Sequence, residues 1–142
     1  MAESTASVTW KGSLLEGGGT IDHVGSGVFG DLPITWKART GEEGGKTTPE
    51  ELIAAAHASC YSMALSHALA QDGNAPDSLE TSATVTFVPG AGITKIALSV
   101  KGSVPDIDEA AFVAAAEDAK ANCPVSKALA AVHEITVEAL LS

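Results

Sequence analysis

The sequence predicts an α+β fold, in which runs of strands and runs of helices follow one another. Glycines divide the first third of the chain into short strand-like pieces, and one long helical segment follows them. Alternating apolar and polar residues then mark further strands around two more helices. The predicted order is three strands, one long helix, two strands, two helices and one strand. With 142 residues, the chain is expected to form a single domain over residues 1–142.

Three strands are predicted before the long helix, at Ser7–Lys11, Thr20–Val24 and Leu32–Arg39. Their valine, isoleucine, threonine and tryptophan residues favour extended backbone, and the glycines between them favour turns. We therefore expect a three-stranded meander whose last strand ends at Arg39.

The long helix is predicted from Pro49 to Gln71, because strong helix formers fill this segment and Asp72-Gly73 ends it. Thr48 is suited to the N-cap, proline is suited to the first helical position, and Glu51 would complete a capping box. The helix is apolar or small on almost every side, so several of its sides must be covered. A single sheet of about six strands covers only one side, so we expect a second copy of the chain to cover the rest.

The second half of the chain is expected to contain two strands, two helices and a final strand. The ranges are Thr81–Val88, Ile93–Lys101, Asp108–Ala121, Cys123–Ala130 and Glu134–Leu140. The strand at 93–101 alternates clearly, with Ile96, Leu98 and Val100 on one face and polar residues on the other. Pro124 favours a helix that starts beside Cys123.

The charge and composition exclude several classes of function. A formal charge of −10 argues against a protein that binds nucleic acid or an anionic membrane surface, because both need a basic surface. No signal peptide or membrane-spanning segment is visible, so a soluble cytoplasmic protein is expected. Two cysteines are too few for a secreted disulfide scaffold, and in a reducing compartment they favour catalysis, redox sensing or metal binding.

Cys60 and Cys123 are the main candidates for chemistry, although two buried structural cysteines would give the same pattern. They do not form a C-x-x-C motif. Cys123 is predicted at a helix start, where free amide groups favour a thiolate. Cys60 lies inside a helix and would need a cation from elsewhere. Arg39, the only arginine in the chain, is the candidate.

A buried Arg39 would need a carboxylate partner. Glu50 is the candidate if Thr48 caps the helix and Glu51 completes the capping box, whereas a cap at Thr47 would exchange the two glutamates. Glu50 is about 15 Å from Cys60 along a straight helix axis. Three alternatives could bring the groups together: a bent helix, a bridging Arg39, or convergence across a subunit interface.

The histidines do not predict a metal site. His57 and His67 share a stripe of the long helix with Cys60, but His67 is about 10 Å from Cys60 along the axis. This is too far for ligands of one zinc ion. We interpret His57 and His67 as packed or interfacial polar residues, and His23 and His133 show no partner pattern.

The two cysteine segments, TPEELIAAAHASCYSMALSHAL and AKANCPVSKAL, resemble the cysteine motifs of the OsmC/Ohr family. The segments ASVTWKGSLLEGGGTI and ITKIALSVKGSVPDID and the position of Arg39 are also similar, so the resemblance covers about residues 6–140. His57 makes the chain more similar to the OsmC branch than to the Ohr branch. Thr40-Gly41 and Thr48 depart from the family pattern, and neither departure removes a catalytic group.

The resemblance implies an OsmC-like intertwined homodimer, with long central helices packed between sheets and active sites at the subunit interface. It also implies a thiol-dependent peroxidase that reduces organic hydroperoxides, without a metal or organic cofactor, and protects against oxidative stress. Cys60 would be the peroxidatic cysteine, Cys123 the resolving cysteine, Arg39 the activating cation and Glu50 its carboxylate partner. An external dithiol, for which the family suggests lipoyl-bearing proteins, would reduce the disulfide. The alternative is a redox-sensing or structural dimer whose cysteine pair changes shape or partner without turnover.

Overall fold

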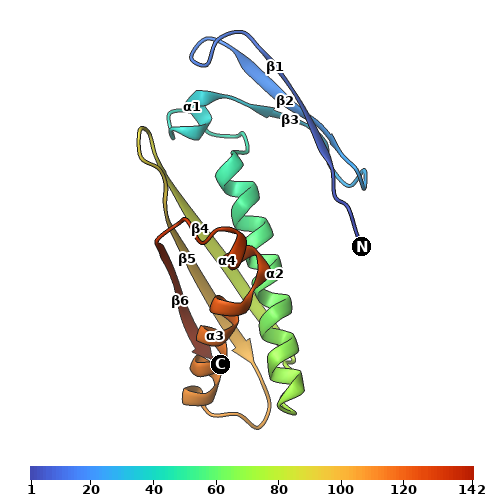
Figure 1. Ribbon diagram of the computed structural model, residues 1–142, viewed down its shortest axis with the longest axis vertical. Coiled ribbons are helices and arrows are strands. Elements are labelled where there is room, and N and C mark those ends of the chain that lie inside the picture. Colours follow the sequence, from blue (N-terminus) through green and yellow to red (C-terminus); the bar gives the residue numbers. More distant parts are fainter. The chain divides into compact units, whose positions relative to one another are not determined.

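The computed structural model describes residues 1–142, which divide into two compact units, Met1–Leu52 and Ile53–Ser142. The elements, labelled in Figure 1, are β1 (Ala6–Lys11), β2 (Gly18–Val24), β3 (Gly30–Ile34), α1 (Trp36–Arg39), α2 (Pro49–Gln71), β4 (Ser78–Val88), β5 (Gly92–Ser103), α3 (Glu109–Asn122), α4 (Pro124–Ala128) and β6 (Glu134–Leu141). The α+β class and the predicted order are confirmed, with one short helix added. That the chain is a single domain stays a prediction.

The first unit contains the predicted meander, but its third strand is shorter than predicted. β1, β2 and β3 pair in this order, and both pairs are antiparallel. The predicted strand Leu32–Arg39 is wrong beyond Ile34, because residues 36–39 form the helical turn α1. The Thr35 hydroxyl accepts a hydrogen bond from the Ala38 N–H at 3.1 Å and so starts this turn. Arg39 therefore lies on a helical turn rather than at the end of a strand.

The strands form two three-stranded sheets, so the expected single sheet of about six strands is wrong. In the second sheet β4 and β5 are antiparallel, and β5 and β6 are parallel. Parallel neighbours need a long crossover, which α3 and α4 provide between β5 and β6. β1, β2 and β3 follow one another closely and pair locally, which forms a separate sheet.

The core of the second unit is formed by one face of its sheet together with α2 and α3. The predicted alternation in β5 is confirmed, since Ile96, Leu98 and Val100 are buried. The main contributors from the two helices are Tyr61, Leu65, Leu69, Phe112, Ala116 and Ala119. Tyr61 also donates from its hydroxyl to the Ala116 carbonyl at 2.9 Å, which joins α2 to α3 inside the core.

Gly102 of β5 packs directly against Phe112 of α3. A Cβ atom at this position would lie 2.5 Å from ring atoms Cε1 and Cζ of Phe112, whose side chain is fully buried. We expect Gly102→Ala to lower the free energy of unfolding by about 1–3 kcal/mol, because the buried ring would have to shift within the core. Urea denaturation measures this change.

Gly44→Ala is the control, since no atom lies within 4 Å of its added Cβ and its stability should stay close to that of the wild type. Equal stability of Gly102→Ala and the wild type would show that the packing at Phe112 is looser than this geometry indicates.

Candidate active site

Cys60 and Cys123 come together in the second unit although they are far apart in the sequence. Cys60 lies on α2 and is partly buried, whereas Cys123 is fully buried. Both are free thiols, and Cys60 packs against the core cluster that includes Cys123, so that the two side chains interact. Two thiols in contact can form a disulfide once one of them has been oxidised to a sulfenic acid.

Cys123 lies between the helices α3 and α4, where backbone hydrogen bonds hold it. Its N–H donates to the Ala119 carbonyl at 2.9 Å, which ends α3. Pro124 then starts α4, and the Lys127 N–H donates back to the Cys123 carbonyl at 3.0 Å. Cys123 therefore ends one helix and begins the next, as the proline after it predicted.

The two thiols have different electrostatic surroundings. Burial raises the pKa of the Cys60 thiol, and contact with Cys123 raises it further, while the Val125 N–H lowers it in part. Burial also raises the pKa of Cys123. This pKa is nevertheless below its ordinary value, because it is lowered by the N–H groups of Ser126 and Val125, the Cys60 side chain and the Ser126 hydroxyl. The Cys123 sulfur makes no regular capping hydrogen bond to α4. The nearby donors still favour the Cys123 thiolate, whereas burial and contact with Cys123 disfavour the Cys60 thiolate.

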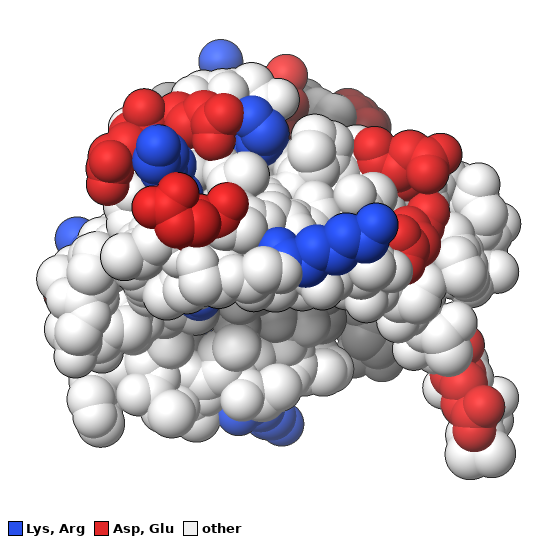
Figure 2. All heavy atoms as spheres, turned by 90° about the horizontal axis from the view of Figure 1, so that it is seen from above, with Lys and Arg blue, Asp and Glu red and all other residues white.

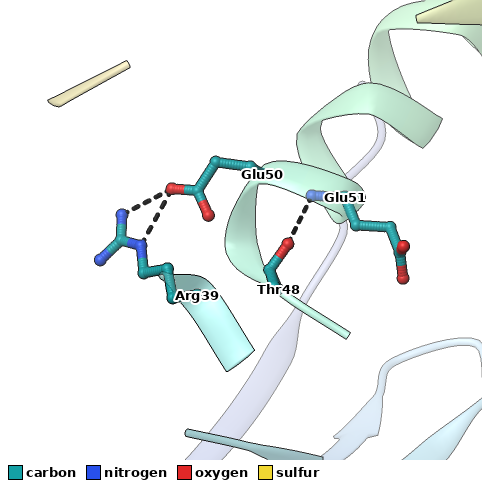
Figure 3. Close-up of polar contacts among 4 residues, drawn as sticks. All are labelled: Arg39, Thr48, Glu50 and Glu51. Carbon is teal, nitrogen blue, oxygen red and sulfur yellow. Dashed lines mark hydrogen bonds and ion pairs between the residues drawn. The ribbon is translucent and has the colours of Figure 1, made fainter. Parts of the chain in front are cut away.

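Arg39 and Glu50 form an ion pair in the first unit. The Arg39 Nε and Nη2 atoms donate to the same oxygen, Glu50 Oε1, at 3.0 and 2.7 Å (Figure 3). The Glu50 side chain is 7% exposed, and its second oxygen is buried without a hydrogen-bond partner. Arg39 is one third exposed, so the pair holds a guanidinium at the edge of the unit in a fixed orientation.

The start of α2 explains why Glu50, and not Glu51, is the partner. The Thr48 hydroxyl accepts a hydrogen bond from the Glu51 N–H at 3.0 Å, which confirms Thr48 as the N-cap (Figure 3). The Glu51 carboxylate points away from Arg39 and accepts from the Thr47 hydroxyl at 2.9 Å, in place of the reciprocal capping-box contact that the sequence predicted. Of the two arrangements left open by the sequence, the structure has the one with Thr48 as cap and Glu50 paired to Arg39.

The four predicted site residues thus form two pairs, each in its own unit. The Arg39–Glu50 pair lies within Met1–Leu52, and the Cys60–Cys123 pair lies within Ile53–Ser142. Glu50 and Cys60 share the uninterrupted helix α2, and about 15 Å of helix axis separates them. The grouping of all four residues into one site stays a prediction.

His57 and Ser126 form a buried contact that the sequence did not reveal. His57 is fully buried on α2, as its interpretation as a packed residue required, and its Nε2 atom lies 2.7 Å from Ser126 Oγ. Ser126 follows Cys123 by one helical turn of α4, so its hydroxyl comes close to the Cys123 sulfur. The spacing of Ser126 from Cys123 was a signal in the sequence, but its pairing with His57 arises only from folding.

The other histidines lie elsewhere. His67 and His133 are exposed, and His23 Nδ1 is 3.1 Å from the Ser7 hydroxyl. No three His, Cys, Asp or Glu side chains of the described chain cluster in the way a metal site requires.

The surface agrees with the acidic composition. On the face shown in Figure 2, acidic side chains gather in several groups within a largely uncharged surface. The formal charge of the chain is −10. None of the helices combines the length and the apolar character that a membrane span requires.

Comparisons with known proteins agree with the family resemblance of the two cysteine segments. A family model described as OsmC-like protein matches residues 41–138. The chain is 45% identical over 133 residues to Peroxiredoxin OsmC of Escherichia coli (strain K12), which covers 91% of this chain and 90% of that protein. The protein of the same name from Shigella flexneri matches to the same extent.

Solved structures share the fold over almost the whole chain. The organic hydroperoxide resistance protein OhrB of Bacillus subtilis aligns with a TM-score of 0.61 and 25% identity, over 97% of this chain and 98% of that chain. An organic hydroperoxide resistance protein OsmC from Legionella pneumophila aligns with a TM-score of 0.64 and 21% identity, over 97% and 96%. The curated relatives support the OsmC branch, to which His57 pointed. The chain belongs to the OsmC family.

Proposed function

We propose that this chain is a peroxiredoxin-type peroxidase that uses Cys60 and Cys123 to reduce organic hydroperoxides to alcohols. The observation that carries the proposal is the contact between a partly exposed thiol and a fully buried thiol. The partly exposed thiol can meet a substrate, and the buried thiol can reach only its neighbour. The names of the relatives, a peroxiredoxin and organic hydroperoxide resistance proteins, support the same chemistry.

In the first step the Cys60 thiolate attacks one oxygen of the peroxide. The O–O bond breaks, an S–O bond forms, and the alkoxide takes a proton and leaves as an alcohol. The sulfur is oxidised to a sulfenic acid, and the peroxide is reduced. Cys123 then attacks the Cys60 sulfur, so an S–S bond forms, the S–O bond breaks, and water leaves. The buried thiol thereby protects Cys60 from further oxidation.

An external dithiol completes the cycle. One of its thiolates attacks the Cys60–Cys123 disulfide, the second closes on the first, and both protein thiols are restored while the dithiol becomes a disulfide. Every electron comes from the dithiol, so this cycle needs neither a metal nor an organic cofactor. A lipoyl-bearing protein has the required chemistry.

Arg39 is proposed to supply the cation that Cys60 lacks in its own unit. The Glu50 carboxylate fixes the guanidinium, whose N–H groups can stabilise the thiolate and orient the peroxide. Because Glu50 and Cys60 of one straight helix are about 15 Å apart, we place this pair beside Cys60 of a second protomer in a homodimer. The exposed side of α2 carries Ala55, Ala56, Ser59 and Met63, with Met63 72% exposed, and this uncharged strip supports a second copy as its cover.

The test is the addition of one equivalent of an organic hydroperoxide to the reduced protein. We expect loss of both thiols, formation of one alcohol per protein, and a mass lower by the two hydrogens of a disulfide. With excess dithiol, many equivalents of peroxide should be consumed, and an alkyl hydroperoxide should react faster than hydrogen peroxide.

A protein that acts as a redox switch gives a different result. Its cysteine pair would oxidise once, and the peroxide would persist although excess dithiol is present. That outcome would overturn the peroxidase proposal.

A further inference from the structure

We propose that His57 and Ser126 act on the Cys123 thiol as a buried proton relay in the step that forms the disulfide. This inference rests on the proposed function. It concerns two residues that lie next to the thiol pair and are not needed for the attack on the peroxide. The Ser126 hydroxyl lies between the Cys123 sulfur and the His57 imidazole. Ser126 follows Cys123 by one helical turn, and its Oγ atom is 2.7 Å from His57 Nε2.

The relay answers a problem that burial creates. Cys123 has no exposed surface, so no bulk water is available to take the thiol proton when the sulfur attacks Cys60. Ser126 is 6% exposed and His57 is fully buried, so the proton has to move within the protein. A serine hydroxyl can accept one proton while it donates another, and a neutral imidazole nitrogen can accept one.

His57 can accept a proton only transiently, because burial disfavours its charged form. Burial lowers the pKa of its imidazole, so the ring is neutral near pH 7 and has one free nitrogen lone pair. Its Nδ1 atom is buried without a hydrogen-bond partner, which leaves Ser126 as the polar contact that this ring makes. The side chain is therefore directed at Ser126 by a single strong interaction.

The proton movement balances. The Ser126 hydroxyl passes its proton to His57 Nε2 and receives the proton of the Cys123 thiol. The thiolate attacks the Cys60 sulfur, the S–S bond forms, and the S–O bond of the sulfenic acid breaks. The leaving hydroxide takes the proton back and departs as water, so His57 and Ser126 return to their starting states. Tyr61, which also interacts with Cys123, donates its hydroxyl hydrogen bond to the Ala116 carbonyl and keeps its own proton because burial raises its pKa.

The test separates the two chemical steps in a rapid-mixing experiment with one equivalent of an organic hydroperoxide. In Ser126→Ala we expect the disulfide to form roughly 100-fold more slowly, so that the Cys60 sulfenic acid accumulates and can be trapped by a dione reagent. His57→Asn should show the same accumulation. A role limited to packing would lower the melting temperature without changing the ratio of the two rates.

Two matched controls come from the same protein. Ser99→Ala removes an exposed serine from β5, and His67→Asn removes an exposed histidine from α2, so both should resolve the sulfenic acid at the wild-type rate. A second readout needs no peroxide and remains informative if His57→Asn does not fold. In the Cys60→Ser variant, the pH titration of the Cys123 thiol is followed by the ultraviolet absorbance of its thiolate, with and without Ser126→Ala. Adding Ser126→Ala should raise the pH midpoint of this titration.

Disulfide formation at the wild-type rate in Ser126→Ala, or an unchanged titration midpoint, would overturn the relay. These outcomes differ from failure of the proposed function. In that case the wild-type protein itself would leave the hydroperoxide intact.

Discussion

Cys60→Ser is expected to reduce the kcat/KM for an organic hydroperoxide by roughly a thousand-fold or more, as removal of a nucleophile does in other enzymes. A serine hydroxyl is a far weaker nucleophile than a thiolate and cannot hold the oxygen as a sulfenic acid. Peroxide consumption in the presence of excess dithiol measures the loss. Full activity in this variant would show that Cys60 is not the nucleophile.

Cys123→Ser is the matched comparison, because it removes the neighbouring thiol and leaves Cys60 in place. This variant should still reduce one equivalent of peroxide, since the attack needs only Cys60. Without a second thiol, no internal disulfide can form, and further peroxide should oxidise Cys60 to sulfinic acid. Intact-mass measurement distinguishes the added oxygens from a disulfide. Equal and complete inactivity of both variants would contradict the division of roles between the two cysteines.

Local signals explain which parts of the fold could be predicted from the sequence. The range Pro49–Gln71 matches the observed helix because its cap, its first-turn proline and the Asp72-Gly73 stop are encoded in adjacent residues. The alternation in β5 likewise reports which side of one strand is buried. Glu50 could be predicted as the partner of Arg39 because the Thr48 cap leaves Glu50 free to pair.

Features that depend on competition between contacts were harder to predict. Trp36 favours a strand, but Lys37, Ala38 and Arg39 favour a helix, and the Thr35 hydroxyl caps a helical turn there. β3 ends at Ile34, which pairs with Gly19, the second residue of β2. Which strands share a sheet depends on long-range pairing, so the sequence did not show that β5 pairs with β6. The contact between His57 and Ser126 links residues 69 positions apart and has no local signal either.

Loss of the Arg39–Glu50 ion pair is expected to lower the stability of the protein. In Arg39→Ala the Glu50 carboxylate, whose side chain is 7% exposed in the structure, loses its cation. Removing one partner of a fully buried ion pair lowers stability by about 3–5 kcal/mol. Arg39 is one third exposed, so solvent screens the pair and a smaller loss of about 1–2 kcal/mol is expected. Arg39→Ala combined with Glu50→Gln removes the unpaired charge and should recover part of this stability.

Arg39→Ala is expected to slow the reaction of Cys60 with an organic hydroperoxide by about 100-fold near pH 7, because both the charge and the directed N–H groups are lost. Burial and Cys123 already raise the pKa of Cys60, so removal of the cation raises it further and moves the rate–pH curve to higher pH. The defect should therefore shrink as pH rises.

Arg39→Lys keeps the charge but not the planar pair of donors, so its curve should keep the wild-type midpoint with a lower plateau. Lys37→Ala, which removes an exposed charge from the same helical turn, is the control. Single-turnover rates measured across pH decide the matter, since identical curves for Arg39→Ala and the wild type would remove Arg39 from the site.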